Sequence, residues 1–138
     1  MKRSIAIVGF MLLASAAFAD PQSEISAYRK SYGLSAVAVD PKLTELASTQ
    51  ANAMAERGSL DHNVYASFRS RMASYGTLSA AENIAMATRT FGDTFAVWKS
   101  SSGHNANLLL PGATRIGIAS ASSKGTIGRL SWLLPPAN

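Results

Sequence analysis

The clearest hydrophobic pattern in the chain covers residues 41–57. Its apolar side chains recur at steps of three and four residues, which predicts a helix with one buried face. Asp40-Pro41 supplies an N-cap and a proline at the first helical position, and Gly58 stops the pattern. The many alanines in this stretch indicate close packing against a neighbouring element. The apolar positions are Leu43, Leu46, Ala47, Ala51, Met54 and Ala55.

Three weaker patterns predict further helices. The first covers residues 24–31, with Ser23 as its expected N-cap. The second covers residues 65–75 and is followed by a glycine. The third covers residues 90–100 and carries large aromatic side chains at steps of four and three, so that Trp98 is expected in the core. These aromatic positions are Phe91, Phe95 and Trp98.

Extended segments separate and follow these helices. Residues 81–87 are predicted as a short strand, and two longer strands are predicted at 114–120 and 126–134. The polar residues 122–125 between the last two predict a hairpin turn. In the last strand one face is expected to carry Leu130, Trp132 and Leu134. This order of elements predicts an α+β fold, a three-layer α-β-α sandwich with a small central antiparallel sheet.

The N-terminus has the composition of an export signal. Lys2-Arg3 precedes an apolar run, and small residues follow that run at Ala17-Phe-Ala19. Residues 1–19 are therefore predicted to be a signal peptide, cleaved after Ala19, and residues 20–138 a single domain. No later stretch is apolar enough to span a membrane. The predicted location is secreted or periplasmic, in a bacterium, with a monomer expected.

Charge and cysteine content exclude several classes of function. The formal net charge of the chain is +5, and removal of Lys2 and Arg3 would lower it to +3. The remaining basic residues form no aromatic-basic stripe, so nucleic acid is not an expected partner. The chain has no cysteine. This excludes disulfides, thiolate metal sites and thiol nucleophiles.

The candidate chemistry lies at the two histidines of the chain. His62 follows a predicted helix, and His104 is expected in a short turn, with Glu82 between them in the sequence. Imidazole and carboxylate are common ligands of zinc, which is therefore the expected divalent metal. Hydrogen bonds from each histidine to a carboxylate are equally compatible with these residues. Asn63 and Asn107 are expected to bind loop backbone through their amides.

Several ordered motifs resemble one known family. They include Asp40-Pro-Lys-Leu43, Met54-Ala-Glu-Arg-Gly-Ser-Leu-Asp-His62, Ala81-Glu-Asn-Ile-Ala85 and Ser101-Ser-Gly-His-Asn-Ala-Asn-Leu-Leu109. The set resembles the cysteine-free bacterial branch of the CAP or SCP-like superfamily (cysteine-rich secretory proteins, antigen 5 and pathogenesis-related 1). The resemblance covers essentially the whole chain after residue 19 and implies an α-β-α sandwich with a cleft.

The resemblance also implies which residues line that cleft. His62, His104 and Glu82 match the family's two histidines and the acid of its Glu-Asn-Ile motif. A second acid, usually glutamate, precedes the helix tryptophan by five residues, and Asp93 occupies that place here. The implied metal ligands are therefore His62, His104, Glu82 and Asp93.

Two functions follow as hypotheses. The first is a binding module at the cell envelope, whose cleft holds a divalent metal, a small molecule, a lipid or cell-wall material. The alternative is a metal-assisted hydrolase of peptide or cell-wall material, in which Glu82 serves as the base. The absence of a recognisable nucleophile motif in the sequence favours binding over catalysis.

Overall fold

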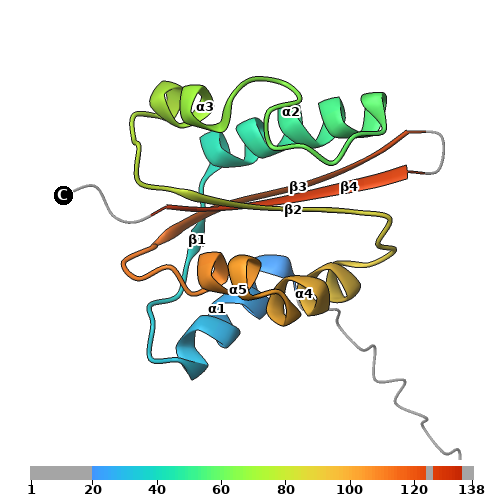
Figure 1. Cartoon of the computed structure of the whole chain (residues 1–138). Helices are drawn as coiled ribbons and strands as arrows, with labels where there is room; N and C mark the ends of the chain where they lie inside the picture. Colours follow the sequence, from blue (N-terminus) through green and yellow to red (C-terminus); the bar gives the residue numbers. More distant parts are fainter. Residues whose placement is uncertain (1–19, 124–125, 135–138) are drawn as a thin grey trace, which may run out of the picture.

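A four-stranded sheet lies between two layers of helices (Figure 1). The computed structural model describes residues 20–123 and 126–134, with no side-chain description from residue 123 onward. The predicted signal peptide at 1–19, most of the predicted hairpin turn and the face assigned to Leu130, Trp132 and Leu134 therefore lie outside what is described. The predicted α-β-α sandwich is confirmed.

The sheet has the strand order β1-β3-β4-β2. β2 (Ala81–Met86) and β3 (Arg115–Ser123) each pair antiparallel with β4 (Thr126–Leu134). The sheet is antiparallel as predicted except at one edge, where β1 (Ala38–Val39) pairs parallel with β3. This strand is only two residues long because Asp40 and Pro41 then begin a helix.

One helical layer consists of α2 (Pro41–Arg57) and α3 (Phe68–Tyr75). α2 is confirmed as predicted: Asp40 Oδ1 accepts a hydrogen bond from the Leu43 backbone at 3.0 Å, and Gly58 ends the helix. α3 begins three residues later than predicted because the Ser67 side chain caps it. The buried cluster beneath this layer is aliphatic: Leu43, Ala47, Ala51, Met54, Val64, Met72 and Ile84.

α2 approaches the sheet closely at one glycine. A Cβ atom added to Gly117 in β3 would overlap the carbonyl carbon of Leu43 and would lie 2.5 Å from the nitrogen of Thr44. Both contacts are with main chain, which cannot move aside as a flexible side chain would. Only glycine therefore allows this contact between α2 and β3.

The opposite layer consists of α1 (Pro21–Ser31), α4 (Phe91–Ser100) and α5 (Ser102–Leu108). α1 begins earlier than predicted because Asp20, rather than Ser23, caps it. α5 was not predicted, since seven residues are too few for a clear hydrophobic period. Burial of Trp98 is confirmed, and its Nε1 donates to the Ile84 carbonyl at 3.3 Å. The cluster beneath this layer is Ile25, Val37, Ala85, Phe95, Trp98, Leu108, Ala113 and Ile116.

A buried arginine ties this layer together. Arg29 in α1 is fully buried and donates to four backbone carbonyls, at distances from 2.8 to 3.1 Å. Burial lowers the pKa of its guanidinium below the usual value. The accepting carbonyls belong to Ser35, Leu108, Leu110 and Ala113. Hydrogen bonds to carbonyls thus solvate this cation within the fold.

A membrane-spanning helix is not found in the described part of the chain, because none of its helices combines sufficient length with sufficient hydropathy.

Candidate functional site

Two neighbouring residues of β2, Glu82 and Asn83, join the two helical layers. Successive side chains of a strand point to opposite faces of a sheet. Glu82 therefore shares a face with Ile84, which packs beneath α2 and α3, whereas Asn83 shares a face with Ala85, on the side of α4 and α5. Both side chains are buried. The candidate site is built on these two residues.

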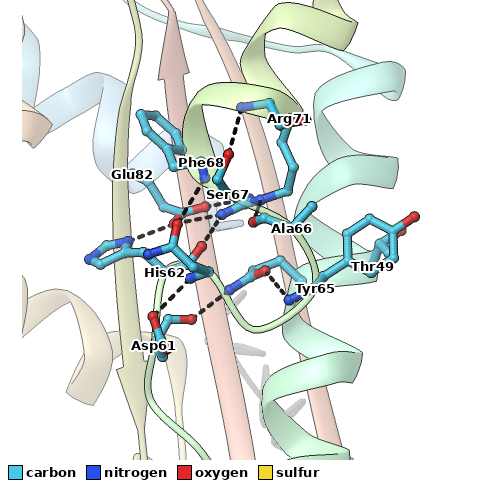
Figure 2. A network of polar contacts seen from close by, with 12 residues as sticks. Thr49, Asp61, His62, Tyr65, Ala66, Ser67, Phe68, Arg71 and Glu82 are labelled. Atoms are coloured by element: carbon cyan, nitrogen blue, oxygen red, sulfur yellow. Dashed lines mark hydrogen bonds and ion pairs between the residues drawn. The ribbon is translucent and has the colours of Figure 1, made fainter.

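On the α2–α3 side, Glu82 is bound by a histidine and an arginine (Figure 2). His62 Nδ1 lies 2.6 Å from Glu82 Oε1. Arg71 Nη1 donates to Glu82 Oε2 at 2.7 Å, and Arg71 Nη2 donates to Oε1 at 3.1 Å. The Glu82 and Arg71 side chains are each 2% exposed, whereas that of His62 is 46% exposed. Glu82 therefore holds the inner nitrogen of His62, and Nε2 is the nitrogen left for a ligand.

Arg71 also holds the loop that carries His62. Its Nη2 donates to the His62 carbonyl, and its Nε donates to the Ala66 carbonyl at 3.1 Å. Gln50 of α2 reaches the same loop, because its Nε2 donates to the Asp61 carbonyl at 2.7 Å. Figure 2 shows these contacts converging on the loop from α2 and α3. The position of the imidazole is thus fixed from several directions.

On the opposite side, Asn83 and α5 are joined by amide hydrogen bonds. Asn83 Nδ2 donates to the His104 carbonyl at 2.9 Å. Asn107 Nδ2 donates to Asn83 Oδ1 at 2.9 Å and to the Glu82 carbonyl at 3.3 Å. The first turn of α5, which carries His104, is thereby fixed to the strand that carries Glu82.

The His104 imidazole lies in an environment that favours its neutral form. Its pKa is lowered from the usual 6.5, first by burial and second by the charge of His62. Among the described residues, His104 Nδ1 is the one buried side-chain nitrogen or oxygen without a hydrogen-bond partner.

Asp93 lies at the start of α4. Its carboxylate accepts a hydrogen bond from the Thr90 backbone at 3.1 Å, and the Thr90 side chain accepts one from the Asp93 backbone at the same distance. This reciprocal pair is a capping box. Across residues 20–123 and 126–134, no three histidine, aspartate or glutamate side chains are grouped so that they could hold a metal ion. The four-residue metal centre implied by the sequence therefore stays a prediction.

The donor set matches a smaller metal site better than the predicted one. Glu82 does not fit as a ligand, because the guanidinium of Arg71 already occupies both of its oxygens. It fits as the partner of a metal-binding histidine, since such histidines commonly donate their other ring nitrogen to a carboxylate. The neutral His104 ring is the second candidate ligand.

A cavity of about 400 Å³ opens beside His62. It is lined by His62, Asn63, Phe68, Ala80, Ala81, Glu82 and Asn107. A separate cavity of about 320 Å³ lies near the start of α1 and is lined in part by Trp98 and Phe91. The first cavity contains two of the candidate residues, His62 and Glu82, whereas His104 is not among the residues that line it.

Sequence reasoning missed two residues of the site, Arg71 and Asn83. Arg71 is one of two basic residues in a short helix, and no spacing distinguishes it from the other, Arg69. The sequence could have pointed to Asn83, because it follows the predicted acid Glu82 in the Glu-Asn-Ile motif. The backbone-binding role predicted for Asn63 is confirmed by its contact with the Phe68 N–H. Asn107 also binds backbone, but at Glu82 in strand β2 and not in a loop.

Comparisons with known proteins agree with this architecture. The model of the family described as "CAP: Cysteine-rich secretory protein family" matches residues 22–132. YkwD of Bacillus subtilis is 31% identical over 102 residues, which are 71% of this chain. This chain spans 40% of the length of that relative.

Two solved structures illustrate the likeness of fold. An outer surface protein from Borrelia burgdorferi has a TM-score of 0.75 at 19% identity, with 84% of this chain and 90% of that chain covered. An extracellular protein containing a SCP domain from Bacillus anthracis has a TM-score of 0.69 at 19% identity, with 84% and 39% covered.

Proposed function

Because the chain belongs to the CAP family of cysteine-rich secretory proteins, we propose that it is a binding module that works outside the cytoplasm. Its ligands bind in the cavity beside His62. An extracytoplasmic location is supported by the export-signal composition of residues 1–19 and by the relatives from Borrelia burgdorferi and Bacillus anthracis, which are described as an outer surface and an extracellular protein.

One observation carries this proposal: the contact of His62 Nδ1 with Glu82 at 2.6 Å. It fixes the ring orientation and leaves Nε2 of a half-exposed imidazole beside the cavity. Arg71 neutralises the carboxylate behind the ring, so the pair can stay buried without a further cation. A fixed ring loses little conformational entropy when a ligand binds.

A divalent metal ion is one proposed ligand, held by the two imidazoles. His62 would bind through Nε2, with Glu82 orienting the ring, and His104 would supply the second nitrogen. Such an ion would polarise an oxygen of a second ligand when bound. Asp93 is not included in this set because it caps α4.

The hydrolase alternative has weaker support. A general base must accept a proton from water or substrate. Both Glu82 oxygens instead accept hydrogen bonds from Arg71, and one of them also contacts His62. We therefore propose binding as the function of this cleft.

Zinc titration by calorimetry, with the purified protein, tests the proposal. His62→Ala and His104→Ala are each expected to weaken zinc binding at least about tenfold, because a two-histidine site loses half of its protein ligands. Asp93→Asn is the matched control, and it should leave the affinity unchanged. Zinc binding that survives both histidine substitutions would contradict the proposed site.

A further inference from the structure

Two asparagines line the cavity beside His62, and each is tied to the backbone at one end of its amide. Asn63 Oδ1 accepts a hydrogen bond from the Phe68 backbone N–H at 3.1 Å. Since a backbone N–H can only donate, this bond fixes the orientation of the amide. The Nδ2 group, a donor, is the end of Asn63 left for a ligand.

Asn107 has the opposite orientation. Its Nδ2 donates to the Glu82 carbonyl at 3.3 Å and to Asn83 Oδ1 at 2.9 Å. A carbonyl oxygen can only accept, so the amide orientation is again fixed by its partner. Asn107 therefore offers Oδ1, an acceptor, to a ligand. The cavity contains one preoriented amide donor and one preoriented amide acceptor.

The remaining lining residues are apolar or neutralised. Phe68, Ala80 and Ala81 supply small apolar surfaces and one half-buried aromatic ring. Glu82 is the one carboxylate among the lining residues, and Arg71 pairs with it. This lining suits an uncharged organic group that has one amide and a small apolar substituent.

We propose that the cavity binds the acetamido group of an N-acetylated amino sugar in a glycan. The acetamido C=O accepts from Asn63 Nδ2, and its N–H donates to Asn107 Oδ1. Its methyl group packs against Ala80 and Ala81, and in the metal-free protein a ring hydroxyl donates to His62 Nε2. This inference rests on the proposed function, because it assigns a substrate class to the same cavity.

A glycan fits the observations better than a peptide does. An extended peptide presents an amide group at every residue, and recognition by strand addition needs a row of backbone partners. The cavity supplies one side-chain donor and one side-chain acceptor, which is what a single acetamido group requires. A sugar hydroxyl beside that amide matches the imidazole, because Nε2 of the neutral ring is an acceptor when Nδ1 donates to Glu82.

Titration with N,N′,N″-triacetylchitotriose tests the inference, with a metal chelator present so that zinc plays no part. Two-dimensional NMR should show shifts of the backbone signals of Asn63, Ala81 and Asn107. The matched ligand control is triglucosamine, which has the same sugar rings but no acetyl groups. It is expected to cause no shifts at these residues, and equal binding of both sugars would overturn the inference.

The substitution Asn63→Asp tests recognition of the sugar without disturbing the fold. The carboxylate keeps the acceptor for the Phe68 N–H but replaces the free donor with an oxygen. Binding of triacetylchitotriose should weaken at least about tenfold, because the acetamido oxygen loses its donor and faces a carboxylate oxygen instead. Asn105→Asp is the control: Asn105 accepts from the Tyr28 hydroxyl at 2.8 Å, an aspartate keeps that role, and the residue does not line the cavity.

The outcomes distinguish this inference from the proposed function. Unchanged sugar binding in Asn63→Asp, or shifts caused by N-acetyl-Ala-Ala-amide and not by the sugar, would overturn the glycan assignment. Zinc binding that depends on His62 and His104 would leave the proposed function intact in either case. If the wild-type protein binds neither zinc nor triacetylchitotriose, both proposals are contradicted.

Discussion

The two faces of the sheet differ in the side chains that are buried against them. Beneath α2 and α3 the buried cluster is aliphatic, and the buried polar group beside it is an ion pair, Arg71 with Glu82. Beneath α1, α4 and α5 the cluster contains Phe95 and Trp98, and the polar contacts are hydrogen bonds to carbonyl oxygens, donated by the amides of Asn83 and Asn107 and by the guanidinium of Arg29. The charged contacts of the candidate site are thus confined to one face.

This difference explains the arrangement of the candidate site. Glu82 and Asn83 are adjacent in β2, and the alternation of the strand sends them to opposite faces. The carboxylate meets charged partners on one face, and the amide meets neutral partners on the other. A two-residue segment thereby fixes the loop of His62 and the helix of His104 relative to each other.

The largest expected effect is on the aromatic face. Trp98→Ala should lower the free energy of unfolding by about 4–5 kcal/mol, because it removes a fully buried ring and leaves the Ile84 carbonyl without its donor. Urea denaturation measures this change. Val97→Ala, at the half-exposed neighbouring position, is the control and should shift the midpoint little. A small effect of Trp98→Ala would contradict the aromatic core.

Breaking the ion pair on the other face should have the next largest effect. Arg71→Leu is expected to cost about 3–4 kcal/mol, because Glu82 becomes a buried, uncompensated charge. The double variant Arg71→Leu/Glu82→Met should recover much of this loss, since apolar residues can replace a buried pair. Urea denaturation of both variants decides this point. If the double variant is no more stable than Arg71→Leu, the uncompensated charge of Glu82 is not the cause of the lost stability.

The face covered by α1, α4 and α5 should respond less at the corresponding position, Asn83. Asn83→Ala removes the donor to the His104 carbonyl, and the expected cost is about 1–3 kcal/mol. The same denaturation measurement compares it with Arg71→Leu. A greater loss in Asn83→Ala than in Arg71→Leu would reverse the comparison between the two faces.

The smallest effect concerns acid stability at the start of α2. Burial tends to raise the pKa of Asp40, but hydrogen bonds from Tyr75, the Leu43 backbone and Arg115 outweigh it and lower that pKa below 3.8. The stabilisation is therefore present above pH 3.8 and is lost as the pH falls through the lowered value. Unfolding followed between pH 2 and pH 5 should show a shallower acid decline in Asp40→Asn. An unchanged slope would exclude Asp40 as a contributor.

The sequence predicted the helices and strands where the local signal was strong. Asp40-Pro41 and Gly58 bound α2 as expected, because caps and helix stops act through neighbouring backbone groups. β1 and α5 were missed because they are too short, at two and seven residues, to show a repeating pattern of hydrophobic positions. Parallel pairing of β1 with β3 joins segments far apart in the chain, and no local pattern encodes it.

The candidate site was predicted in part. The residue types of His62, Glu82 and His104 indicated the chemistry, and the structure brings His62 to Glu82. Arg71 escaped prediction because its importance depends on burial beside Glu82, which only the packing of α3 against the sheet produces. Asp93 has a local role that its sequence context also allowed, since Thr90 three residues earlier completes a capping box.

The hydrogen bonds from Arg29 to backbone carbonyls have a consequence for local unfolding. The four acceptors lie in the connector after α1 and in the segment that runs from the end of α5 toward β3. If α1 detached alone, four carbonyls and a guanidinium would lose their partners together. These segments should therefore exchange their amide hydrogens with one shared opening free energy, as a single cooperative unit. The helix that carries His104 then stays in place for as long as α1 remains bound.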